Sequence, residues 1–259
     1  MLEVILTPGP PGGRLAYLRE LCGRDEGLVQ GTSSATAASL LERLLVALPG
    51  AAVTPDQVAD LAVCDRDRLL AAIHRDTFGD RIETRAPCRA CGIPFELAFS
   101  LTALEADIAA RTAPHSPDGT RRLPDGRRFR LPTLADERAL VGLALLDASR
   151  TLAARCILDG EADDPEAVLA AIERAGPLLD LELSATCPEC QAEQPVHFDI
   201  QSFLLTALLR EVPGLAREVH RIAVAYGWTL TEILELPRNQ RRLYVALIEA
   251  ERTTRRTRA

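Results

Sequence analysis

Two pairs of cysteines, each with two residues between its members, constrain the fold of this chain more than any other feature. Cys88 and Cys91 form the first pair, and Cys187 and Cys190 form the second. A C-x-x-C turn directs two thiolates at one point, and two such turns supply the four sulfur ligands of a tetrahedral zinc site. Each pair precedes alternating residues that are typical of a β-strand. The pattern therefore predicts the two knuckles of a zinc ribbon with one structural zinc ion.

The stretch of sequence between the two pairs is unusually long. An ordinary zinc ribbon has roughly 15–20 residues between its knuckles, whereas residues 92–186 separate them here. Long segments without secondary structure are uncommon inside compact domains. We therefore expect a ribbon that is split by a folded insertion.

Two other uses of the cysteine pairs remain open. A redox pair usually lies at the start of a helix, whereas both pairs here precede strand-like residues. Disulfide frameworks are typical of small secreted proteins, and a chain of 259 residues with seven cysteines is not of that kind. The sequence also starts without a basic segment and a long apolar run, so we expect no signal peptide. The remaining cysteines are predicted to be small core residues: Cys22, Cys64 and Cys156.

A metal site made of four cysteines has no open coordination position for water or substrate. Such a site stabilises a fold and does not catalyse a reaction. A catalytic zinc ion would need a different ligand, and His197 is the nearest histidine in sequence to either pair. Strand alternation places His197 on the face opposite Val196 and Phe198, so we predict that it faces solvent.

The composition limits the kinds of partner. The net charge is −7, and the chain contains no lysine, so all 30 basic residues are arginines. An acidic chain in which only 4% of residues are aromatic is poorly suited to binding nucleic acid. No apolar run approaches the roughly 20 residues that are needed to cross a bilayer. We therefore expect a cytoplasmic protein that has no membrane segment and that binds neither nucleic acid nor a small-molecule substrate.

Known catalytic patterns are missing from the sequence. The glycine-rich residues 9–13 lack the Lys and Ser/Thr of a phosphate-binding loop. Asp65 and Asp67 open a predicted helix, where acidic side chains complement the helix dipole. We therefore expect that the protein is not an enzyme.

Sequence patterns predict a mainly α-helical α+β fold in five parts. They are an N-terminal helical region over residues 1–80, the split zinc ribbon over 81–101 and 178–200, an inserted α+β module over 102–177, a C-terminal helical unit over 201–252 and a basic tail over 253–259. The tail is expected to be unordered.

Several local predictions are specific enough to test. Trp228, the only tryptophan, is expected to fill the core of the C-terminal helical unit. The others are an extended lead over residues 1–13, a short helix over 14–22, a hairpin over 121–131 with a two-residue turn at Asp125–Gly126, a helix over 133–147, a strand over 178–184, and separate helices over 201–210 and 212–226.

Parts of the sequence resemble a known protein family. The segments are His220–Tyr244, which contains Tyr226-Gly-Trp228, together with Leu18–Glu26, Leu61–Leu70 and Phe78–Asp80 immediately before the Cys88 pair. Together they are similar to the baseplate hub assembly chaperone family of T-even-like phages and of related contractile injection systems. The resemblance implies a non-enzymatic role in building or completing a baseplate, with other baseplate, hub or tail proteins as partners.

Two alternative functions belong to other classes. A zinc ribbon that acts on nucleic acid would need a basic face near the knuckles, for which Arg81, Arg85 and Arg89 are the candidates. A zinc hydrolase would need a ligand other than cysteine, or an open coordination position.

Overall fold

The computed structural model describes residues 1–6, 15–112 and 120–258, without the side chains of Arg252 and of residues 255–258. Most of the extended lead predicted before residue 14, and the loop predicted over 113–119, lie outside the described residues. The described chain is mixed α/β, with many helices and small antiparallel sheets of two strands each. Among its helices, none combines the length and the apolar character that a bilayer crossing requires.

The N-terminal part starts with a β-hairpin, so the helix predicted over residues 14–22 is wrong. Ala16 and Leu18 are buried while Leu15 and Tyr17 are only half-buried, which is the period of a strand. A short apolar run fits either period, and pairing with the first strand decides the outcome. The elements of this part are β1 (Leu2–Ile5), β2 (Leu15–Leu18), α1 (Gly23–Leu28), α2 (Ser34–Leu44), the 3-10 helix η1 (Pro55–Asp60) and α3 (Val63–Phe78).

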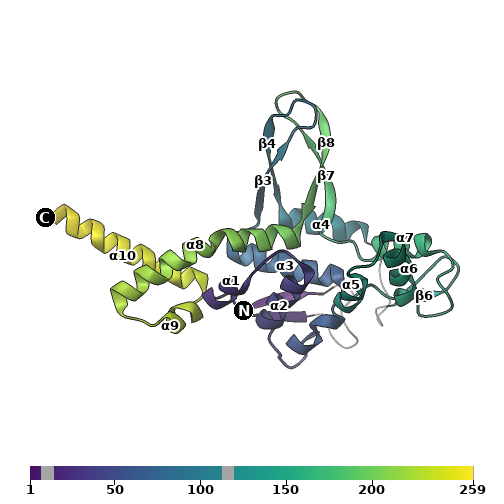
Figure 1. Cartoon of the computed structure of the whole chain (residues 1–259), viewed down its shortest axis with the longest axis horizontal. Helices are drawn as coiled ribbons and strands as arrows, with labels where there is room; N and C mark the ends of the chain where they lie inside the picture. Colours follow the sequence, from purple (N-terminus) through teal and green to yellow (C-terminus); the bar gives the residue numbers. More distant parts are fainter. Residues whose placement is uncertain (7–14, 113–119, 259) are drawn as a thin grey trace.

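Two β-ribbons follow the same plan. In each, two antiparallel strands of seven residues enclose a cysteine pair, and a helix begins where the second strand ends. Ser100 and Asp199 cap these helices with their side chains. The two ribbons project together from the helical body (Figure 1). Their elements are β3 (Arg81–Pro87), β4 (Pro94–Ser100) and α4 (Leu101–Arg111), then β7 (Asp180–Thr186), β8 (Glu193–Asp199) and α8 (Ile200–Tyr226).

The main core forms between the N-terminal helices and the first half of α8. Leu41 of α2, Leu69 of α3 and Leu204 of α8 are fully buried in it. Since α8 follows the second ribbon directly, this core fixes the base of that ribbon on the N-terminal helices. The body therefore holds the ribbon pair through α3, which precedes the first ribbon, and through α8, which follows the second.

The inserted module has its own core around Phe129, Cys156 and Val168. The single helix predicted over residues 133–147 is wrong, because Gly142 has a positive φ of 84° and separates two helices. The elements are β5 (Arg121–Arg122), β6 (Arg128–Phe129), α5 (Leu134–Leu140), α6 (Leu145–Cys156) and α7 (Pro165–Ala175).

The hairpin in this module is present, but its turn has three residues instead of the predicted two. The Leu123 N–H donates to the Arg127 carbonyl (2.8 Å), which leaves residues 124–126 as the loop. Pro124 fixes its own φ near about −65°, whereas a two-residue type I′ turn needs positive φ at its first central residue. A type I turn followed by Gly126 at a φ of 91° satisfies both residues.

The C-terminal part differs from its prediction in two places. One continuous helix, α8, replaces the two helices predicted over residues 201–210 and 212–226, because Pro213 lies on the exposed side, where a missing hydrogen bond faces solvent. The basic tail is helical and belongs to α10 as far as Arg258. Arginines suit this place because they complement the negative end of a helix dipole. The remaining elements are α9 (Leu230–Glu235) and α10 (Arg238–Arg258).

Trp228 is half-buried at the edge of the C-terminal core, and the prediction that it fills that core is wrong. Its ring stacks on Tyr226 and meets the edge of Tyr244, with ring centroids 5.3 and 5.1 Å apart. A large indole is rarely fully covered by three short helical segments. The centre of this small core consists of three isoleucines, Ile222, Ile233 and Ile248.

A buried aspartate held by two arginines occurs twice in the chain. Asp25 in α1 accepts hydrogen bonds from Arg19 (2.7 and 2.8 Å) and Arg43 (3.2 Å). Burial raises the pKa of Asp25, but the hydrogen bonds from Arg19 and from the N-cap residue outweigh burial and lower it to about 2. The same arrangement in α5 consists of Asp136, Arg130 and Arg155.

The glutamate after each aspartate binds an arginine from a distant helix. Glu26 accepts hydrogen bonds from Arg238 (3.2 Å) and Arg241 (2.5 Å) at the start of α10, and Arg241 is fully buried. Glu137 accepts two hydrogen bonds (2.8 and 3.0 Å) from Arg66 at the start of α3. These contacts join each short helix, α1 or α5, to a helix far away in sequence.

Each of the two distant helices, α3 and α10, is preceded by a short helix that begins with a capping box. Thr54 and Gln57 form this box at the start of η1, and Thr229 and Glu232 form it at the start of α9. An isolated β-bridge then joins the residue just before each distant helix to the residue just before the short helix that it contacts. Ala62 pairs with Thr133, and Pro237 pairs with Cys22. The chain therefore contains two copies of one docking unit: α5 on η1–α3, and α1 on α9–α10.

We predict that Glu26→Ala lowers the free energy of unfolding by about 3 kcal/mol, because it removes one of the two carboxylates that pair with the fully buried Arg241 and leaves part of its guanidinium group buried without a partner. Urea denaturation measures this loss. The control is Glu235→Ala, which removes an exposed ion pair with Arg24 and should cost less than about 1 kcal/mol. Equal losses in the two variants would show that the Glu26 contact does not join the two ends of the chain.

Candidate metal centre

Each cysteine pair lies in a tight turn between the two strands of its ribbon. In the first turn, the Cys88 N–H donates to the Ile93 carbonyl (3.1 Å), and the Gly92 N–H donates to the Cys88 carbonyl (2.9 Å). In the second, Cys187, Ala192 and Gln191 make the same two bonds, at 2.9 Å each. The residue after the second cysteine has positive φ in both turns, 76° at Gly92 and 59° at Gln191. The backbone thus directs both thiols of each pair to the same side.

The four predicted cysteines meet at one point, although the pairs are far apart in sequence. All four sulfur atoms lie within 4.8 Å of one another. Cys88 and Cys190 have their sulfurs 3.6 Å apart, and Cys91 and Cys187 have theirs 3.9 Å apart. A disulfide requires about 2.05 Å, so the four thiols are free. The first cysteine of each pair is buried and the second is exposed.

The thiols of Cys88 and Cys190 have very different pKa values. The N–H groups of Cys91 and Ala90 stabilise the Cys88 thiolate and lower the pKa of Cys88 to about 6. The Ala192 N–H favours the Cys190 thiolate, but the neighbouring sulfurs, Cys88 foremost, oppose a second negative charge and raise the pKa of Cys190 to about 12. Four adjacent sulfurs therefore cannot all ionise alone. A bound cation removes this repulsion, and these residues could hold a metal ion.

Gln194, which sequence reasoning missed, ties the two ribbons together beside the cysteines. Its side-chain oxygen accepts a hydrogen bond from the Arg89 N–H (2.7 Å), and its amide nitrogen donates to the Pro87 carbonyl (3.0 Å). Gln194 is buried, and from the second ribbon it forms hydrogen bonds with the backbone on both sides of Cys88. Strand parity could have found it, because Gln194 shares the inward face with Val196.

A small apolar layer supports the cysteines from below. Ala86 and Phe95 of the first ribbon pack against Ala185 of the second, with the buried Cys88 and Cys187 in the same cluster. Leu97 and Val196 extend this layer toward the body. The apolar contacts between the inner faces of the two ribbons therefore hold the two cysteine turns together. Side chains on the exposed faces take no part in this layer.

His197 lies outside the cysteine cluster and faces solvent, as predicted. Its imidazole is within 3.4 Å of Asp180 and 3.9 Å of Glu182, on the neighbouring strand. The candidate metal centre thus contains sulfur atoms only, and no histidine belongs to it. The geometry gives no support to a mixed shell with an open position.

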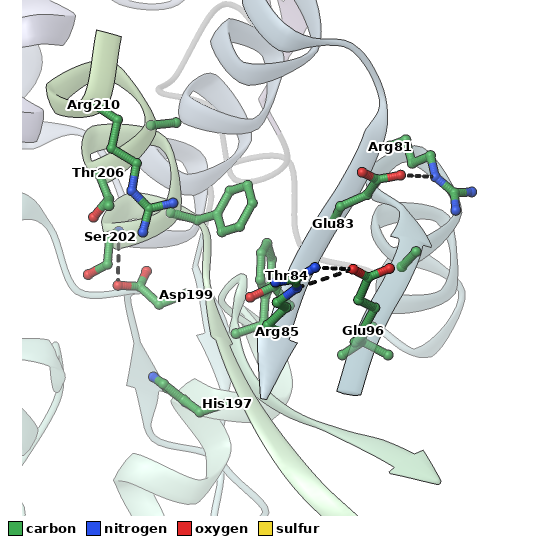
Figure 2. A pocket seen from close by; sticks show the side chains of 15 residues that line it. Arg81, Glu83, Thr84, Arg85, Glu96, His197, Asp199, Ser202, Thr206 and Arg210 are labelled. Carbon is green, nitrogen blue, oxygen red and sulfur yellow. Dashed lines mark hydrogen bonds and ion pairs between the residues drawn. The ribbon is translucent and has the colours of Figure 1, made fainter. Parts of the chain in front are cut away.

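A groove lies between the base of the ribbons and the start of α8 (Figure 2). It has a volume of about 720 Å³ and is lined by charged, polar and apolar side chains from β3, β4, β8 and α8. Several of these are bound to one another: Arg85 donates to Glu96 (2.7 Å), and Asp199 accepts from the N–H of Ser202 (3.1 Å). The charged groups of the groove therefore serve mainly as local ion pairs and helix caps.

The other three cysteines are buried away from the cluster, as predicted. Burial raises the pKa of Cys156 to about 11 and raises that of Cys64 further. Both thiols pack in the core of the inserted module. Cys22 is the N-cap residue of α1, and its thiol donates to Asp25 (3.1 Å).

We predict that Gln194→Ala costs about 1–3 kcal/mol of unfolding free energy, because it leaves the Arg89 N–H and the Pro87 carbonyl without their partner. Chemical denaturation and amide hydrogen exchange at Arg89 measure the effect. Gln240→Ala, at an exposed position of α10, is the matched control and should change stability by less than about 0.5 kcal/mol. If the Arg89 amide exchanges at the same rate in Gln194→Ala as in the wild type, Gln194 does not hold the first turn.

Comparison of the chain with protein-family models, with curated proteins and with solved structures finds no match. The conclusions about its function are therefore based on the sequence and on the geometry of the cysteine cluster. That cluster is a site of four thiols from two structurally equivalent turns, and it could bind a metal ion.

Proposed function

We propose that the four cysteines bind one structural zinc ion and that the protein is a non-enzymatic structural or assembly component of a contractile injection system or phage-tail baseplate. The sulfur geometry supports the choice of metal. Zinc–sulfur bonds of about 2.3 Å in a tetrahedron place the sulfurs about 3.8 Å apart. Two of the sulfur–sulfur distances here are 3.6 and 3.9 Å, and all lie within 4.8 Å.

The arrangement of the sulfurs suits a metal that connects two parts of a protein. Each ribbon contributes two ligands, so zinc would fasten the first ribbon to the second at the end farthest from the helical body. The first ribbon continues from α3, and the second continues into α8. A bound ion would therefore limit how these helices move relative to each other.

The donor set supports a role without catalysis. Four cysteine ligands complete the coordination of zinc and leave no position for water or substrate. In the described structure, the carboxylates beside the ribbons are engaged in ion pairs and helix caps. These features favour a protein that acts by binding other proteins.

The assignment to a baseplate is supported by the sequence resemblance. Its most specific segment, Tyr226-Gly-Trp228, joins α8 to α9, and residues 65–70 belong to α3. Both segments lie in or beside the two copies of the docking unit. The segments that carry the resemblance thus lie in or beside the part of the chain that forms the carboxylate–arginine contacts described above.

We predict that the purified protein contains one zinc ion per chain and that Cys187→Ser removes it, with a loss of several kcal/mol of stability. Elemental analysis and thermal unfolding measure these effects, and Co²⁺ substitution should give the absorption bands of a four-thiolate tetrahedral site. Cys22→Ser is the matched control, because serine also caps a helix and Cys22 is outside the cluster. Zinc retention in Cys187→Ser with unchanged melting would refute the zinc site.

We also predict that deleting this gene from a complete set of tail genes prevents baseplate formation. Electron microscopy of the particles measures the loss, and expression of the wild-type chain, but not of Cys187→Ser, should restore baseplates. Normal particles in the deletion strain would refute the assembly role. Binding of nucleic acid by the purified protein at moderate salt would instead favour the alternative function of a zinc ribbon.

A further inference from the structure

An exposed apolar surface lies where α5 joins α6. It consists of Val141, Leu143, Leu145 and Leu146, and we call it the α5–α6 patch. Val141 is 82% exposed and Leu145 is 85% exposed, which are large values for adjacent aliphatic residues. No charged residue occurs within residues 141–146. Contiguous apolar surfaces of this kind usually mark a site of protein interaction.

The equivalent position in the first half of the chain is buried. Val29 ends α1 as Val141 ends α5, yet Val29 belongs to the main core. Two helical elements, η1 and α3, lie between α2 and the first ribbon, whereas α7 alone lies between α6 and the second ribbon. The two halves therefore differ in how many helical elements follow this position, and in the second half the apolar side chains there are exposed.

A helix with exposed leucines, α10, lies at the other end of the molecule. α10 corresponds to α3, because Arg241 binds Glu26 as Arg66 binds Glu137. Leu69 and Leu70 of α3 are fully buried. Leu243 and Leu247, one turn apart on α10, are about half exposed, at 59% and 48%. α10 extends away from the body at the end opposite to α6 and α7 (Figure 1).

The charges of these two ends are complementary. Residues 159–166, which run from the end of α6 into the first turn of α7, contain five acidic residues and no basic residue: Asp159, Glu161, Asp163, Asp164 and Glu166. Asp159 already pairs with Arg128, which leaves four acidic residues for a partner. Residues 252–259 contain four arginines and no acidic residue. Helix geometry also matches, since Leu145 to Cys156 spans about 17 Å and Leu243 to Arg256 spans about 20 Å at about 1.5 Å per residue.

We propose that copies of this chain associate head to tail, with α10 of one copy lying along α6 of the next. Leu243 and Leu247 cover the α5–α6 patch, and the arginine-rich end of α10 lies beside the acidic residues 159–166. The contact joins two different surfaces, so each copy retains one free surface of each kind and the association continues into a chain or a closed ring. This proposal does not depend on the zinc site or on the baseplate assignment.

Sedimentation velocity of the full-length protein over a range of concentrations tests the proposal. We expect oligomers larger than a dimer that grow with concentration and shrink as salt is raised, because the arginine–carboxylate part of the contact is screened. Leu145→Glu and Leu247→Glu should each be monomeric. Leu28→Glu is the matched control, at an exposed leucine of α1 outside both surfaces, and should associate like the wild type.

An equimolar mixture of the two glutamate variants gives the decisive result. Leu145→Glu retains an intact α10, and Leu247→Glu retains an intact α5–α6 patch, so the mixture should form a heterodimer and stop there. Circular dichroism confirms that each variant is folded. A wild-type protein that stays monomeric at every concentration overturns the proposal. Oligomers that persist in either variant, or a mixture that stays monomeric, overturn it as well.

Discussion

Buried arginines held by carboxylates from distant parts of the sequence organise this fold. Glu26 near the N-terminus binds Arg238 and Arg241 near the C-terminus, and Glu137 in the insertion binds Arg66 in the N-terminal helices. An unpaired buried charge is so unfavourable that these residues strongly disfavour any arrangement in which the partners do not meet. Arginine suits this task because its planar group donates several hydrogen bonds at once. In a chain without lysine, every such contact uses arginine.

The cysteine cluster depends on the apolar core beside these contacts. That core holds α3 and the start of α8 together, and the two ribbons grow from those helices. Because both ribbons have the same length and register, their turns reach the same height above the body. Gln194 and the small apolar layer then bring the turns into contact. In the proposed function, zinc completes an arrangement that the protein has largely built by itself.

Local sequence signals predicted local geometry well. The spacing of the cysteines, the strands around them and the threonine caps at Thr133 and Thr229 each depend on a few adjacent residues. Elements whose identity depends on distant partners were predicted less well. The strand at residues 15–18 needs β1 beside it, and α8 continues through Pro213 because that residue is on the exposed side.

The internal repetition was hidden because equivalent positions share a role and not a residue type. Ser100 and Asp199 both cap a helix, Gly92 and Gln191 both adopt positive φ, and the N-cap residues before Asp25 and Asp136 are Cys22 and Thr133. Gln194 escaped attention for a related reason, since a polar residue in a strand looks like a solvent-facing one. Its contacts are made with the other ribbon, which no local pattern describes.

The separation of contact partners along the chain has a consequence for biosynthesis. A ribosome adds roughly 5–20 residues per second, so Cys88 and Cys91 emerge many seconds before Cys187 and Cys190. Glu26 waits longer still, because Arg241 is made 215 residues later. A nascent chain that has not yet reached Cys187 therefore keeps the Glu26 carboxylate and the two thiols of the first pair without their partners.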